Sequence, residues 1–135
     1  IQYIQMNFIH FKLYSGGKFM TVEKIKELLS AQVICGEESL SRDVHTACGS
    51  DMMSDVLAFV KDQAVLLTGL VNPQVVRTAE MMDMCCIVFV RGKKPDDSII
   101  NLARERDIVL LCTTYEMFTS CGILYQNGLR GGSGK

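Results

Sequence analysis

The sequence contains no tryptophan, only two prolines and almost no net charge. Its 14 lysine and arginine residues nearly balance 15 aspartate and glutamate residues, so the chain lacks the basic excess by which nucleic-acid-binding proteins hold phosphates. No run approaches the roughly 18 consecutive apolar residues that a membrane-spanning helix needs. We therefore expect neither a nucleic-acid partner nor a membrane span.

A phosphate-binding loop is also missing. Two glycines precede Lys18, but Phe19 stands where such a loop needs a serine or threonine to hold Mg²⁺, and no glycine stands five positions before Gly17. The segment therefore does not predict a nucleotide site of that type.

The six cysteines form no C-x-x-C pair. Cys85 and Cys86 are adjacent, and neighbours on a strand point to opposite faces, so they are poorly placed to share one metal. Cys35 and Cys112 lie in or beside apolar runs, where free cysteine behaves as a small hydrophobe. We predict reduced core thiols, a cytoplasmic protein, and neither a metal nor a cofactor.

Apolar runs alternate with helical patterns along the chain. The runs "AVLL" (64–67), "CIVFV" (86–90) and "IVLLC" (108–112) are apolar throughout, as strands are when both faces of a sheet are covered. Shorter strands are expected at 32–35 and 44–48. Spacing and capping residues indicate helices at 22–29, 50–61, 72–83, 95–107 and 113–128. The pattern predicts a single α/β domain over residues 20–128, with a mainly parallel β-sheet of four to five strands and helices on both faces.

The two ends of the chain differ from this domain. We expect residues 129–135, "LRGGSGK", to be a flexible tail. The segment "SGGK" (15–18) can be encoded by DNA containing GGAGG, a bacterial ribosome-binding sequence, at start-codon spacing from Met20. We therefore expect residues 1–19 to be a translated leader or flexible extension. A genuine N-terminal strand is the alternative, because the composition of the segment is β-prone.

Residues 20–44, "MTVEKIKELLSAQVICGEESLSRDV", resemble the opening of DRTGG domains and of the N-terminal domain of the HPr kinase/phosphorylase family. The shared features are a short helix, a strand and a G-E-E-x-L-x-R-x-V segment (36–44). Residues 87–124 resemble the family's second half, in which a strand leads through a G-x-x-P loop (92–95) to a helix and another strand. The resemblance is strongest to stand-alone DRTGG proteins and implies a regulatory or ligand-sensing module.

The chain departs from the residues that name the family. "GLVNPQ" (69–74) stands where other members carry Asp-Arg, and "VRGKK" (90–94) stands where they carry Thr-Gly-Gly, so that only Gly92 is kept. The P-loop domain of the HPr kinases does not accompany these segments. The roles of the family's naming residues therefore do not transfer to this chain.

Polar residues follow the predicted parallel strands, at the sheet edge where open α/β sheets bind ligands. Donors and cations suit an anion there, although helix capping alone also accounts for several of these residues. The predicted ligand-binding set is Ser50, Asp51, Thr68, Gly69, Asn72, Arg91, Gly92, Lys93 and Thr113.

Three functions remain open. We expect a non-catalytic regulatory or ligand-sensing module that binds a small anionic ligand, a nucleotide or a partner protein. The second hypothesis is a structural domain that self-associates. The third is a small enzyme using Asp51 and Cys48, whose place near a predicted helix N-terminus would lower its thiol pKa. Methionine-rich helices at 49–60 and 77–84 also predict a homodimer, because methionine adapts well to contact surfaces.

Overall fold

The computed structural model describes residues 20–59 and 63–132. The leader predicted for residues 1–19 and the last three residues of the predicted tail lie outside these residues. Within the described range, five strands form the main sheet in the order β2-β7-β6-β5-β4. The strands are β2 (Gln32–Cys35), β4 (Thr46–Gly49), β5 (Ala64–Thr68), β6 (Cys86–Phe89) and β7 (Val109–Cys112).

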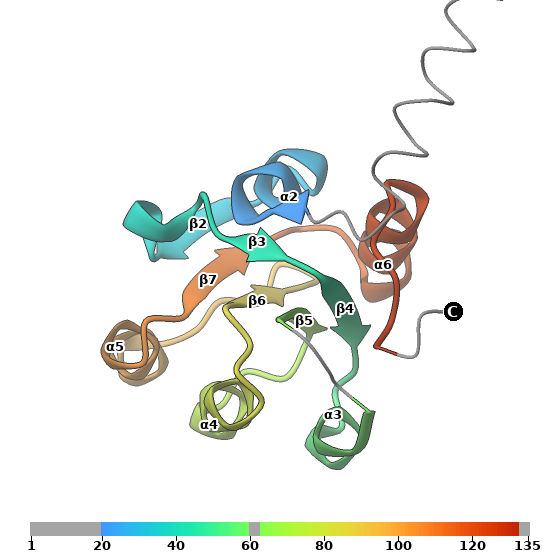
Figure 1. The fold of residues 1–135 in the computed structure, drawn as a ribbon. Coiled ribbons are helices and arrows are strands. Elements are labelled where there is room, and N and C mark those ends of the chain that lie inside the picture. Colours follow the sequence, from blue (N-terminus) through green and yellow to red (C-terminus); the bar gives the residue numbers. More distant parts are fainter. Residues whose placement is uncertain (1–19, 60–62, 133–135) are drawn as a thin grey trace, which may run out of the picture.

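Strands β4 to β7 are parallel and follow one another in chain order. Their crossovers carry α3 (Met53–Phe59), α4 (Pro73–Met81) and α5 (Asp97–Glu105). Because right-handed crossovers that advance in one direction lie on one face, these three helices cover the same side of the sheet (Figure 1). The other side is covered by α2 (Val22–Leu28) and α6 (Met117–Gln126) (Figure 1). The predicted α/β fold with helices on both faces is confirmed.

The three apolar runs are the interior strands β5, β6 and β7, and all their residues are buried. Side chains alternate between the two helical layers: Leu66 and Ile87 pack toward α3, α4 and α5, whereas Val65 and Val88 pack toward α2 and α6. A fully buried side chain of this kind stabilises the fold by roughly 1.5–3 kcal/mol. Both faces must be apolar, which explains why these strands show no alternation in the sequence.

The sheet edges are built differently. Strand β2 is antiparallel to β7 and carries an irregularity in register between Val33 and Cys35. It is followed by the 3-10 turn η1 (Glu37–Ser39) and by β3 (Asp43–Val44), which pairs with β1 (Met20–Thr21) in a separate two-stranded sheet.

The far edge strand, β4, pairs with the chain's last described segment. The backbone N–H of Ala47 donates to the carbonyl of Arg130 at 2.9 Å, and Leu129 is buried in the core. The packed domain therefore continues past residue 128, the boundary expected from the sequence.

Candidate functional site

The four parallel strands end at one edge of the sheet, and the loops that follow them meet there. Gly49 pairs with Leu67, Thr68 with Phe89, and Phe89 with Cys112, so the strands end at nearly the same level. This is the edge at which open parallel sheets bind ligands.

Asp51 joins the loops after β4 and β5. One carboxylate oxygen accepts from the backbone N–H of Gly69 at 2.7 Å and from the hydroxyl of Thr68 at 3.0 Å. The Thr68 hydroxyl in turn accepts from the N–H of Leu70 at 3.1 Å, and Thr68 is fully buried. These bonds hold the two loops together, so Asp51 and Thr68 support the edge from within the chain.

The loop after β6 begins with two residues in the left-handed region, Arg91 at φ +61° and Gly92 at φ +71°. The N–H of Lys93 donates to the carbonyl of Val90 at 3.2 Å, which closes a tight turn. Two successive positive φ angles match a type I′ turn, whose first position rarely holds a side chain as large as arginine. Of the four other described non-glycine residues with positive φ, Ser30, Asp83 and Asp107 directly follow helix ends, where this conformation is common, and Gln63 directly precedes β5.

This turn is fixed to the loop after β7 through the backbone. The N–H of Arg91 donates to the carbonyl of Tyr115 at 2.8 Å, and the N–H of Gly92 donates to the carbonyl of Thr113 at 2.9 Å. The position of Arg91 is therefore coupled to the segment that leads into α6.

The Arg91 guanidinium lies against Gly69. A Cβ built on Gly69 would stand 2.3 Å from Nη2 of Arg91, so no side chain fits there unless the arginine moves. Arg91 thus reaches from the loop after β6 to the start of the loop after β5, where the N–H of Gly69 donates to Asp51. Lys93 and Lys94 are exposed in the same loop as Arg91 and add positive charge to it.

Three other predicted ligand residues have side chains that are engaged within the chain, namely Ser50, Asn72 and Thr113. The hydroxyl of Ser50 accepts from the backbone N–H two residues further on, at 3.0 Å. Asn72 caps α4 as expected, and Asp96 caps α5. Thr113 is buried and donates to the carbonyl of Leu29 at 2.7 Å. The structure therefore brings Asp51, Thr68, Gly69 and Arg91 into contact. The cations of the loop after β6 share this edge with carboxylates, namely Asp51, Asp96 and Glu116.

The proposed pairing of Cys48 with Asp51 lacks an activated thiol. Cys48 is half-buried and packs toward α3, and burial raises its pKa above the ordinary value of 9.0. A nucleophilic cysteine needs the opposite shift, toward the thiolate at neutral pH. The Asp51 carboxylate is meanwhile engaged with Thr68 and Gly69. This geometry does not favour catalysis by the pair.

Residues 20–59 and 63–132 contain no cluster of three His, Cys, Asp or Glu side chains that could hold a metal ion. No helix in the same residues is long and apolar enough to cross a membrane.

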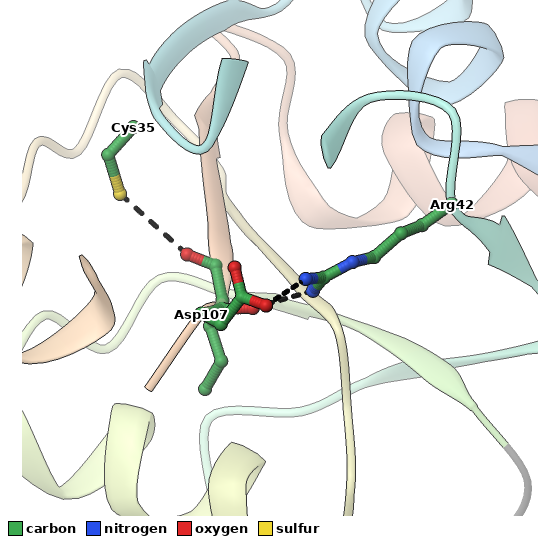
Figure 2. Close-up of polar contacts among 4 residues, drawn as sticks. Cys35, Arg42 and Asp107 are labelled. Carbon is green, nitrogen blue, oxygen red and sulfur yellow. Dashed lines mark hydrogen bonds and ion pairs between the residues drawn. The ribbon is translucent and has the colours of Figure 1, made fainter. Parts of the chain in front are cut away.

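The G-E-E-x-L-x-R-x-V segment supports the fold at the opposite end of the parallel strands. Gly36 has φ +92°, and a Cβ there would stand 2.9 Å from Cα of Val109 at the start of β7. The Arg42 guanidinium donates to both the carboxylate and the backbone carbonyl of Asp107, in the turn after α5 (Figure 2). The Cys35 thiol donates to the carbonyl of Ile108 at 3.7 Å (Figure 2). These contacts fix the turn that leads into β7.

The fold and the meeting of loops at one sheet edge define a small open-sheet α/β domain. Residues 24–126 match the family model of the DRTGG domain, which covers most of the chain. The chain therefore belongs to the DRTGG domain family, and the resemblance seen in the sequence is confirmed.

A solved structure with a similar fold is the crystal structure of the CBS and DRTGG domains of the regulatory region of Clostridium perfringens pyrophosphatase, complexed with its activator, diadenosine tetraphosphate. The TM-score is 0.63 and the sequence identity is 19%. The match covers 78% of this chain but only 46% of the other, so the chain spans about half of that regulatory region. No curated protein sequence matches the chain significantly.

Proposed function

We propose that this chain is a regulatory module, without catalytic activity of its own, that senses a small anionic ligand at the carboxyl edge of its sheet. The observation that carries the proposal is the placement of the Arg91 guanidinium over Gly69, where the loops after β4, β5 and β6 meet. The exposed side chains of Lys93 and Lys94 extend the positive charge of the same loop.

The chemistry of these groups favours a phosphate or carboxylate. A guanidinium presents a planar fork of donors that matches either anion, and the two ammonium groups add charge without a fixed direction. A regulatory region that shares this fold was crystallised with a dinucleotide activator, which supports nucleotides as the first ligands to test.

A ligand that moves Arg91 would also move the backbone segment that is hydrogen-bonded to the Arg91 turn. The backbone bonds from Arg91 to Tyr115 and from Gly92 to Thr113 pass any displacement to the loop before α6. We propose this loop as the route from ligand binding to a change in the module's contacts, because it is the direct connection between the charged turn and α6.

The test is thermal unfolding of the full chain against a panel of nucleotides and phosphorylated metabolites, followed by calorimetry of any ligand found. A ligand at 100 times its Kd stabilises the native state by about 2.7 kcal/mol. Arg91→Ala should weaken binding by roughly 1.5–3 kcal/mol, the size of a hydrogen bond to a charged group. Arg77→Ala, on the exposed surface of α4, removes the same charge away from the edge and should leave affinity unchanged.

Gly69→Ala is a second variant for the binding experiment, and it leaves every charged side chain in place. Its methyl group would force the flexible end of Arg91 aside, so the affinity should fall while the unfolding midpoint without ligand changes little. Ligand binding that survives both Arg91→Ala and Gly69→Ala would refute this site. A panel that contains no stabilising ligand would refute the sensing function.

A further inference from the structure

Arg91 holds a backbone conformation that arginine does not favour. Its φ of +61° lies in the left-handed region, at the first central position of a tight turn. A conformation of this kind persists only where the surrounding structure holds it. The N–H of Arg91 donates to the carbonyl of Tyr115, and the next N–H, of Gly92, donates to the carbonyl of Thr113. The placement of the guanidinium therefore depends on how firmly the segment after β7 is fixed.

The hydroxyl of Thr113 fixes this segment from inside the protein. It donates to the carbonyl of Leu29 at 2.7 Å and accepts from the backbone N–H of Tyr115 at 3.2 Å. Thr113 is only 2% exposed, so the side chain is shielded from solvent. A hydroxyl has a single hydrogen to donate, and because that hydrogen is directed at Leu29, the oxygen is left to accept from Tyr115. Both bonds therefore constrain the residue whose carbonyl receives the N–H of Arg91.

The partner of Thr113 lies at the end of α2. Leu29 is the C-cap of this helix, and the last carbonyls of a helix have no partner within it. A second contact joins the same two segments, since the hydroxyl oxygens of Ser30 and Tyr115 lie 3.3 Å apart. Ser30 is exposed, so this second contact is weaker than the buried bond. The end of α2 is thus the anchor of the segment that holds the Arg91 turn.

We propose that Thr113 is a positioning residue of the candidate anion site, which holds the Arg91 turn in place through its hydroxyl without touching the ligand. The proposal rests on the proposed function, because Arg91 is the group that it positions. A role confined to capping α2 needs only the bond to Leu29. The bond from the N–H of Tyr115 links the same hydroxyl to the segment that holds Arg91.

Amide hydrogen exchange of the full chain without ligand, followed residue by residue by NMR, tests this role. Thr113→Val keeps the shape of the side chain but removes both hydrogen bonds, so the Arg91 amide should exchange roughly fivefold faster. Thr114→Val makes the same change at the exposed neighbouring residue and should alter this rate by less than about twofold. The amide of Val88, in the interior strand β6, reports global unfolding in the same sample.

Thr113→Ser separates positioning from packing. Serine keeps the hydroxyl but leaves the space of a buried methyl group empty, so Thr113→Ser should lower the unfolding midpoint. Thr113→Val should lower it as well, because the carbonyl of Leu29 loses its partner. Only Thr113→Val should speed exchange of the Arg91 amide relative to that of Val88. A purely structural threonine would give two variants that are alike in both measurements.

Inorganic phosphate is the probe for the anion site, and the NMR signal of the Arg91 Nε–H reports its binding. Thr113→Val should raise the phosphate Kd roughly fivefold, whereas Thr113→Ser and Thr114→Val should change it by less than about twofold. If phosphate does not move this signal in the unaltered chain, the proposed anion site is refuted, and amide exchange alone decides the positioning role. Equal exchange of the Arg91 amide in Thr113→Val and Thr113→Ser, or an effect of Thr113→Val no larger than that of Thr114→Val, would overturn the positioning role.

Discussion

Gly36→Ala should strongly destabilise the fold, for two separable reasons. The φ angle of +92° is one that a side chain makes unfavourable, at a cost of about 1–2 kcal/mol. The new methyl group would also stand 2.9 Å from both Cα and Cγ2 of Val109. Because β7 is an interior strand, its backbone cannot easily shift, and overpacking of this kind costs about 1–3 kcal/mol. The expected loss is therefore roughly 2–5 kcal/mol, out of a total that is typically 5–15 kcal/mol.

Urea unfolding of Gly36→Ala beside Gly128→Ala separates the two costs. Gly128 has φ +112°, further from the left-handed well than Gly36, but among residues 20–59 and 63–132 no atom beyond its two chain neighbours lies within 4 Å of its Cβ position. Its substitution therefore measures the backbone cost alone and, if anything, overstates it. The excess of Gly36→Ala over Gly128→Ala is the clash with Val109. An equal or smaller loss for Gly36→Ala would refute the assignment of Gly36 to close packing against β7.

Other predictions concern charge and the thiols. Arg42→Ala should lower the free energy of unfolding by about 1 kcal/mol, because its partly exposed bonds to Asp107 are lost. Burial raises the pKa of Cys112 to about 11, against 9.0 ordinarily. Below pH 9 both states keep the proton, but between pH 9 and 11 the unfolded chain releases it first, so stability should fall, and less steeply in Cys112→Ala. Mass spectrometry after alkylation at pH 7 should show no preference for Cys48 over Cys121, the other half-buried thiol, because burial raises the pKa of both, and modification selective for Cys48 would revive the enzyme hypothesis. Asp51→Asn keeps the oxygen that accepts from Gly69 but removes a negative charge, so calorimetry should show tighter binding of an anion at the edge.

The order and type of the main elements could be predicted because they depend on local chemistry. The strands β5, β6 and β7 are apolar at every position, since each is covered on both faces, and this pattern is visible without any knowledge of their partners. Asn72 caps α4, as its position before Pro73 indicates. Features of this kind are specified within a few residues of the chain.

The first residue of each helix was harder to predict, because neighbouring residues compete for the N-cap position. Helix α5 was expected to begin with Pro95, but Asp96 forms the cap by accepting from the N–H of Ile99 at 3.0 Å. Helix α6 begins at Met117 instead of Thr113, because the Thr113 hydroxyl bonds to the carbonyl of Leu29 and accepts from the N–H of Tyr115. The Thr113–Leu29 bond joins residues far apart in the chain, so the sequence alone gives no sign of it.

The sequence suggested which residues form the candidate site, but it did not indicate how they contact one another. Asp51 was proposed as a helix cap or ligand, whereas its carboxylate accepts from the next loop, at Gly69. Tyr115 was missed because it contributes its backbone carbonyl, a role that leaves no signal in side-chain identity. The contact of Arg91 with Gly69 likewise depends on how two loops approach each other after the sheet has formed.

Residues that follow the family pattern and residues that depart from it lie at opposite ends of the parallel strands. The family-like residues Gly36 and Arg42 hold the turn before β7, where they touch Val109 and Asp107. The segments that differ from the family pattern, 69–74 and 90–94, both begin at the carboxyl edge, and there Arg91 lies on Gly69. If this edge binds the ligand, the changed residues alter the chemistry that meets it while the shared residues preserve the fold. We therefore expect the preferred anion to differ from that of family members with Asp-Arg and Thr-Gly-Gly at these positions. Identical ligand preferences in a side-by-side thermal unfolding panel would argue that recognition lies elsewhere.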